Sequence, residues 1–184
     1  MSNQADVLEQ IIMERRSIRK YKDQPVDRKT LQRILNCGIN APNGMNWQAY
    51  EIRVIDNPEL LDMFTAAVVH DNPDVAQREG FKNIFVDAPT VLFIAKSDRY
   101  ELSSVDCGLL AQNIMLSAQS LGVGSCCLGS SARWLKSSPS AMPCLDKLNF
   151  SKGHELFFCI ALGYPDQEKP AKPRRTDMIQ YIEQ

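Results

Sequence analysis

The segment Thr90–Ala95 constrains the fold more than any other part of the chain, because its six residues, TVLFIA, carry no charge. A short run of this kind, rich in β-branched and aromatic side chains, predicts a strand that is covered on both faces. Tyr50–Ile55 instead alternates polar with apolar residues, which predicts a strand exposed on one face. Together with two further strand-like runs, at Val123–Leu128 and Glu155–Leu162, the sequence predicts a sheet that helices must cover.

Helical periodicity marks the segments between these strands. We expect Asp27 to cap one helix and Pro42 to end it, with an apolar face made by Leu31, Ile34, Leu35 and Gly38. Further helices are expected over Val7–Ile12, over Asn57–Val68, and over a long segment that Ser103 or Ser104 caps and Gly122 ends. The serine- and proline-rich stretch Ser130–Phe150 is expected to be mainly loop. This order of elements indicates a mixed α+β or an α/β protein.

Composition favours one compact domain. The chain has 184 residues, 44% of them hydrophobic, which is enough for one sizeable core. Its 21 Lys and Arg nearly balance 22 Asp and Glu, so the net charge of −1 offers no general attraction to nucleic acid or to an anionic membrane. We expect a cytoplasmic protein, because the chain shows neither a basic-then-apolar leader nor an apolar run of bilayer length. Six cysteines without C-x-x-C spacing and two distant histidines predict reduced thiols and no metal site.

Two basic clusters stand out against this balanced charge. Arg15–Arg19 offers planar guanidinium groups that match phosphate oxygens in pairs, and Ser17 adds a hydroxyl donor. The alternative is that these charges are simply solvated at the end of a helix. The second cluster, near the C-terminus, consists of Lys169, Lys172, Arg174 and Arg175. The sequence has neither G-x-G-x-x-G after a strand nor G-x-x-x-x-G-K-[ST], which disfavours a Rossmann dinucleotide fold and a P-loop.

The stretch Ala41–Tyr50 joins an expected helix to an expected strand through proline, glycine and small amides. An ordinary turn would have this composition. Alternatively, its asparagine side chains and free backbone amides can hydrogen-bond a flat heterocycle or a polyol.

The order of several short segments resembles the nitroreductase family over about residues 5 to 176. The segments are Arg15–Tyr21, Ala41–Gln48, Asp87–Pro89, Asp106–Gly108 with Asn113, Gly122–Cys126 with Gly129, and Lys172–Arg174. The resemblance implies an α+β fold with a mixed sheet flanked by helices. It implies one FMN-binding domain over residues 1–184, in which 164–184 form a polar C-terminal arm. The chain departs from the family pattern at Ala49, where proline is usual, and at Cys127, where tryptophan is frequent.

The resemblance further implies a homodimer that holds two FMN molecules at its interface, each contacted by both chains. Arg15, Arg16 and Ser17 would hold the phosphate and ribityl end of FMN. Arg19 would lie near the N1 and O2 edge of the flavin, where a cation stabilises the anionic reduced form.

Other residues are assigned to the same cofactor by the resemblance. Leu128 and Gly129 would lie beside the flavin, with a backbone amide near N5. Lys172 and Arg174 would contact the phosphate. The partner chain would line the isoalloxazine and ribityl side with Pro42, Asn43, Gly44 and Asn46.

The activity implied by the resemblance is that of an FMN-dependent oxidoreductase. NADH or NADPH would deliver hydride to flavin N5 and leave, and a nitroaromatic, quinone or similar small-molecule acceptor would then occupy the same face, in a ping-pong mechanism without a catalytic side chain. The absence of G-x-S-x-G and of an obvious Cys–His pair agrees with this mechanism. Alternatives are reductive dehalogenation, substrate dehydrogenation, a non-enzymatic flavin carrier or sensor, and an interaction domain without a cofactor.

Two features stay open at this point. The polar stretch His70–Asn83 is either a mobile cover over the site or an ordinary surface loop. Cys126 and Cys127 could be redox thiols, but neighbours on a strand point to opposite faces, and packing explains such a run better.

Overall fold

The computed structural model describes residues 3–182, and its sheet confirms the predicted strands. They are β1 (Tyr50–Ile55), β2 (Thr90–Ser97), β3 (Gly124–Leu128) and β4 (His154–Gly163). The strands lie in the order β1-β2-β4-β3, and neighbouring strands pair antiparallel. The strand β2, which contains the uncharged run Thr90–Ala95, therefore lies inside the sheet, while the alternating strand β1 forms one edge. Residues 1, 2, 183 and 184 of the expected domain lie outside the described residues.

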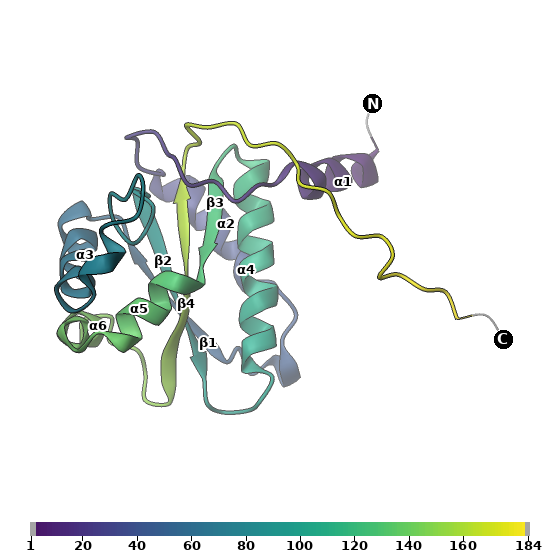
Figure 1. Ribbon diagram of the computed structural model, residues 1–184. Helices are drawn as coiled ribbons and strands as arrows, with labels where there is room; N and C mark the ends of the chain where they lie inside the picture. The colour runs from purple at the N-terminus through teal and green to yellow at the C-terminus, as the bar shows by residue number, and fades with distance from the viewer. Residues whose placement is uncertain (1–2, 183–184) are drawn as a thin grey trace.

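Helices cover both faces of this sheet and confirm the α+β class (Figure 1). One face carries α2 (Arg28–Ile39) and α4 (Ser103–Ser120). The other carries α3 (Pro58–Asp71), α5 (Gly129–Ser137) and α6 (Met142–Asp146).

Alternate side chains of β2 supply the two cores, because successive residues of a strand point to opposite faces. Val91 and Phe93 pack on the side of α3 and α5. Leu92 and Ile94 pack on the side of α2 and α4. All four side chains are fully buried, so β2 joins the two helical layers through one sheet.

The close packing of α2 against α4 depends on a glycine. A Cβ atom on Gly38 would lie 2.5 Å from Cγ1 of Ile114, so a larger residue would push the helices apart. Asp27 caps α2 as expected, accepting a hydrogen bond from the amide of Thr30 at 2.9 Å. Gly122 follows α4 with a φ of +71°, which fits its predicted role at the helix end.

Two local predictions were wrong. Ser103 does not cap α4: Leu102 occupies the cap position without a side-chain hydrogen bond, and the Ser103 hydroxyl donates to the carbonyl of Ser97 at 2.6 Å instead. The stretch 130–150 is not mainly loop, since it holds most of α5, all of α6 and a 3-10 turn. With nine and five residues and no side-chain caps, these helices are too short for periodicity to reveal.

Both ends of the chain project from the sheet (Figure 1). The helix α1 (Gln4–Glu14) buries none of its residues, and Leu8 and Met13 are 54% and 73% exposed. After β4, the chain runs past α1 and away from the body, and residues 170–182 are all exposed. The expected polar arm ends, within the described residues, in four exposed apolar side chains: Met178, Ile179, Tyr181 and Ile182. Within residues 3–182, no helix has both the length and the apolarity needed to cross a membrane.

Candidate functional site

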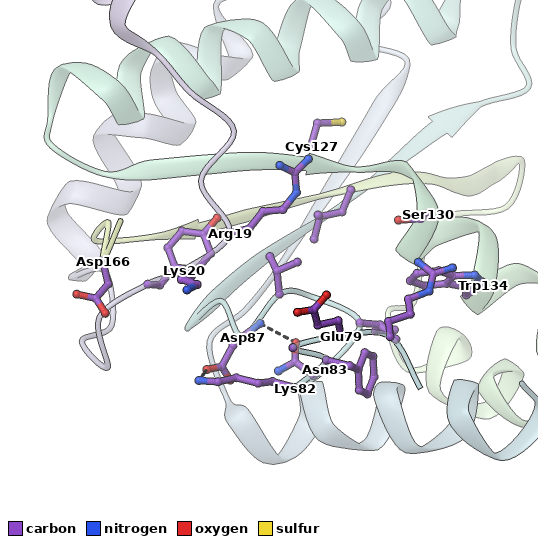
Figure 2. A pocket seen from close by; sticks show the side chains of 17 residues that line it. Arg19, Lys20, Glu79, Lys82, Asn83, Asp87, Cys127, Ser130, Trp134 and Asp166 are labelled. Carbon is purple, nitrogen blue, oxygen red and sulfur yellow. Dashed lines mark hydrogen bonds and ion pairs between the residues drawn. The ribbon is translucent and has the colours of Figure 1, made fainter. Parts of the chain in front are cut away.

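A pocket of about 630 Å³ opens beside the end of β3. Three segments line most of it: Arg19–Tyr21, residues 78–87, and the stretch from Cys127 into α5 as far as Trp134. Asp166 of the C-terminal arm lies at its border. Figure 2 shows Arg19 extending into the pocket toward the strand that carries Cys127, with Trp134 on the side of α5. Of the predicted site residues, Arg19 and Leu128 line this pocket directly.

The segment that follows α1 is held against the sheet by backbone hydrogen bonds. The amide of Ile18 donates to the carbonyl of Ser125 on β3 at 3.0 Å. The Tyr21 hydroxyl donates to the Ile18 carbonyl at 2.6 Å, and burial raises the pKa of Tyr21, so this phenol stays protonated as a donor. On its other side, Lys20 accepts a hydrogen bond from the amide of Asp166 at 3.0 Å. The early arginine segment therefore lies between β3 and the arm.

Cations from both ends of the chain gather next to β3. Lys169 of the arm donates to the Ser17 carbonyl at 3.3 Å. Burial raises the pKa of the Cys126 thiol, while the positive charges of Arg19, Lys169 and Arg15 act on it in the opposite direction. Ser17 pairs with Ser125, the neighbour of Cys126 on β3, so the arginine segment and Lys169 lie together beside this strand. The two basic clusters of the sequence thus meet in the fold, although through Lys169 rather than through Lys172 or Arg174.

Unsatisfied polar atoms lie at the same junction. Arg16 Nε, Ser125 Oγ and Gln167 Nε2 are buried and have no hydrogen-bond partner in the described structure. Arg16 also donates to the carbonyl of Met13 at 2.5 Å, which fixes its guanidinium group at the end of α1. Buried polar atoms normally find partners, so this junction fits a polar ligand that supplies them. A phosphate or ribityl group, with its many oxygens, has the required chemistry.

The turn from β3 into α5 offers backbone donors to the same pocket. Leu128 ends the strand and Gly129 begins the helix, and no side chain caps this helix end. Free amides at a helix start carry partial positive charge and stabilise an electron-rich ligand. The strand residues before them alternate as predicted, with Cys126 buried and Cys127 exposed on the side of β3 that faces away from Asn83 and Trp134 (Figure 2).

The loop before β2 forms a wall of the pocket that sequence reasoning missed. Asn83 Oδ1 accepts hydrogen bonds from the amides of Phe85 and Asp87, both at 2.9 Å. Val86 and Asp87 have φ values of 54° and 58°, a backbone conformation that is rare for a β-branched residue such as valine. Lys82 pairs with Asp87 at 2.5 Å. Of the stretch His70–Asn83, considered as a possible cover over the site, only the residues from 78 onward line the pocket.

A cation stacks on an aromatic ring at this wall. The guanidinium carbon of Arg78 lies 4.4 Å from the ring centroid of Trp134 on α5. Such a pair presents a flat surface with a positive charge at its edge. Because Arg78 and Trp134 are 56 positions apart in the sequence, no local pattern could have joined them.

The predicted residues Pro42–Asn46 lie elsewhere. They follow α2, and the amide of Gly44 donates to Asp106 in the first turn of α4 at 3.2 Å. The arginine segment, by contrast, pairs with Ser125, beyond the last turn of the same helix. With 18 residues, α4 is about 27 Å long, so one chain cannot bring both segments to one small ligand.

Lys172 and Arg174 lie on the exposed arm, beyond the point where Lys169 meets Ser17. No side-chain hydrogen bond or ion pair involves either residue in the described part of the chain. Their expected contact with a phosphate stays a prediction.

A serine–histidine–aspartate cluster away from the pocket does not form a catalytic triad. Ser140 Oγ and Asp71 Oδ1 approach the same ring nitrogen, Nδ1 of His70, at 3.1 and 2.9 Å. A triad requires the carboxylate on one ring nitrogen and the hydroxyl on the other. Asp71 also accepts a hydrogen bond from the Ser140 amide at 2.8 Å, so the cluster joins α3 to the turn before α6.

This cluster should make stability depend on pH. Hydrogen bonds from His70 and then from Ser140 lower the pKa of Asp71 below its ordinary value of 3.8. A lowered carboxyl pKa stabilises the fold at pH values above the ordinary one, and the stabilisation disappears as the pH falls through the folded value. We expect Asp71→Asn to lower Tm at neutral pH, with a difference from wild type that shrinks in acid. Thermal unfolding from neutral pH down to about pH 3 tests this, and a constant difference would contradict it.

The fold and the pocket together define a class of α+β protein, in which a pocket at the end of an antiparallel sheet lies beside a junction of basic residues and unpartnered polar atoms. Residues 12–164 match the family model described as the Nitroreductase family, which covers most of the chain. The chain belongs to this family.

Related proteins agree with this assignment. An NADPH-flavin oxidoreductase from Vibrio harveyi is 28% identical over 170 residues, which are 89% of this chain and 68% of the relative. A crystal structure of a nitroreductase with bound FMN from Desulfitobacterium hafniense covers 100% of both chains with a TM-score of 0.86 and 29% identity. An FMN-dependent nitroreductase from Clostridium difficile has a TM-score of 0.82 over 97% of this chain and 100% of its own, with 25% identity.

Proposed function

We propose that the chain is an FMN-dependent oxidoreductase that uses NADH or NADPH to reduce a nitroaromatic, a quinone or a similar organic acceptor. One observation carries the proposal: Lys169 and the segment Arg15–Arg19 meet from opposite ends of the chain, next to buried polar atoms that lack partners. The relatives named above support both the cofactor and the electron donor.

The residues at this junction fit FMN in a definite order. Arg15, Arg16 and Ser17 hold the phosphate and ribityl end, where Arg16 Nε needs a hydrogen-bond acceptor. Arg19 reaches into the pocket, where its charge would lie at the N1 and O2 edge of a bound flavin. The uncapped start of α5, at Gly129, offers a free backbone amide that would meet N5 of the flavin.

FMN held here would supply the hydride chemistry between the nicotinamide and the acceptor. The protein contributes position and charge. The Arg19 guanidinium group would stabilise negative charge on the edge of the flavin that it faces. The Asn83 loop, fixed by two hydrogen bonds, keeps the pocket wall in shape.

We also propose that the enzyme is a homodimer in which each FMN contacts both chains. The length of α4 keeps Pro42, Asn43, Gly44 and Asn46 away from the arginine segment of their own chain, so these residues reach an FMN only in a partner. Exposed apolar side chains on α1 and, separately, at the end of the arm support an interface, because a partner chain would cover them. Lys172 and Arg174 of the arm complete the phosphate contacts in this arrangement.

Spectroscopy of the purified protein tests the function. We expect a yellow protein whose flavin absorbance is bleached by NADH or NADPH under anaerobic conditions and restored by an added quinone or nitroaromatic. A yellow protein that neither nucleotide reduces would instead be a flavin carrier or sensor. A protein that stays colourless after FMN is added would refute the proposal and favour an interaction domain without a cofactor.

A further inference from the structure

The loop after α2 is held in an unusual conformation. Met45, Asn46 and Gln48 have φ values of 52°, 54° and 48°, which non-glycine residues rarely adopt. Asn43 supports the loop from within, because its Oδ1 accepts a hydrogen bond from the Gln48 amide at 2.9 Å. Met45 at the tip is 82% exposed, so the loop faces away from its own chain.

Two side chains from outside the loop hold its glycine. The amide of Gly44 lies 3.2 Å from Asp106 Oδ1 and 3.3 Å from the Tyr100 hydroxyl oxygen. The Tyr100 hydroxyl in turn donates to Asp106 Oδ2. Asp106 is only 4% exposed, so its carboxylate depends on these donors. We call Tyr100 and Asp106 the Gly44 clamp.

The approach of the clamp leaves no room for a side chain. A Cβ atom on Gly44 would lie 2.6 Å from the Tyr100 hydroxyl oxygen and 2.9 Å from its Cε2. Trp47 packs edge-on against Tyr100 with ring centroids 4.9 Å apart, and the guanidinium carbon of Arg99 lies 4.6 Å from the centroid of the Trp47 ring. The loop is therefore fixed at the Gly44 amide by the clamp and at its end by the contact of Trp47 with Tyr100.

We propose that Tyr100 and Asp106 are positioning residues for the FMN of the neighbouring subunit. They hold Asn43, Gly44 and Asn46 in the conformation in which these residues meet the partner's flavin. The inference rests on the proposed function, and it assigns a role in FMN binding to two residues about one α4 length away from the arginine segment of their own chain.

The physical reason lies in the shared hydrogen bonds. Removing the Tyr100 hydroxyl takes one donor from a buried carboxylate and one acceptor from the Gly44 amide. Met45 and Asn46, which follow Gly44 with positive φ values, are then no longer held in this conformation, and the loop samples others. Ordering it again on FMN binding costs free energy, which appears as weaker affinity at the partner's site.

Titration of apo-protein with FMN, followed by quenching of flavin fluorescence, measures the effect. We expect Tyr100→Phe and Asp106→Asn to raise the Kd for FMN about fivefold to twentyfold, in line with the loss of one or two hydrogen bonds. At saturating FMN, kcat should stay close to wild type, since neither residue touches the reacting atoms. Tyr50→Phe is the matched control, because the Tyr50 hydroxyl donates nearby to the Ile39 carbonyl without contacting the loop. An unchanged Kd in both clamp variants would overturn the inference.

A mixed dimer distinguishes action on the partner from a general loss of structure. Chains carrying Arg15→Ala and chains carrying Tyr100→Phe are given different tags, co-expressed and purified as heterodimers. If the clamp acts on the partner's site, one site combines an intact arginine segment with an intact clamp and binds FMN with wild-type affinity. If the clamp acts on its own chain, both sites are defective and no wild-type site remains, which would overturn the inference.

Failure of the proposed function gives a different result. In that case, the Arg15→Ala homodimer binds FMN as tightly as wild type, or the wild-type protein binds none. If the Arg15→Ala homodimer binds FMN more weakly than wild type and the heterodimer has no wild-type site, only the role of the clamp is refuted.

Discussion

Replacing Arg15 with alanine is expected to weaken FMN binding roughly tenfold to a hundredfold, because a charge-assisted hydrogen bond to a phosphate contributes about 1.5–3 kcal/mol. Arg15 adjoins Arg16, whose Nε is buried without a partner, and its charge acts on the Cys126 thiol together with those of Arg19 and Lys169. The effect should appear as an increased Kd in fluorescence titrations of the apo-protein.

Arg33→Ala is a suitable control for this experiment, since Arg33 is exposed on α2, away from the pocket. It should leave the Kd unchanged. Raising the salt concentration should narrow the difference between Arg15→Ala and wild type, because exposed charge interactions are screened. If Arg15→Ala retains wild-type affinity for FMN, the phosphate does not lie at this segment.

The largest effect on stability is expected for Phe93→Ala, at about 3–5 kcal/mol. Phe93 is fully buried on β2, and its ring centroid lies 5.1 Å from that of Phe64 and 5.5 Å from that of Phe85. Removing it leaves a cavity under the loop that forms the pocket wall, because Phe85 belongs to that loop. FMN should therefore bind more weakly as well.

Urea unfolding measures the change, which should shift the midpoint with little change in the slope. Phe157→Ala is the comparison, since Phe157 is only partly buried and lies on the neighbouring strand β4. It should cost distinctly less than Phe93→Ala. A loss below about 1 kcal/mol for Phe93→Ala would mean that the core collapses around the missing ring.

The sequence predicted the sheet and the long helices because their patterns extend over whole elements. The uncharged run of β2 and the alternation of β1 are direct consequences of burial on two faces or on one. The sequence did not predict α5 and α6, because these helices are short, have no side-chain caps and are stabilised by the packing of their buried residues. The prediction that Ser103 caps α4 was wrong for a related reason. Its hydroxyl could have capped the helix, but it donates a hydrogen bond to the carbonyl of Ser97 at the end of β2 instead.

For the candidate site as well, residues that are consecutive in the sequence could be predicted, whereas contacts between distant positions could not. Segments of consecutive residues, such as Arg15–Arg19, could be recognised because the phosphate-binding chemistry is concentrated in one place. The cation–ring pair of Arg78 with Trp134 and the contact of Asp106 with Gly44 join positions 56 and 62 residues apart, and only the fold brings them together. The hydrogen bonds of Asn83 are local, and an asparagine two and four residues before its partners could have indicated this turn.

The long helix α4 has one more consequence. Because it separates the two halves of the proposed site within each polypeptide, flavin retention and subunit association are thermodynamically linked. Dilution below the dimer dissociation constant should release the cofactor, and excess FMN should in turn hold the subunits together. The yellow colour of a dilute sample would then report directly on its quaternary state.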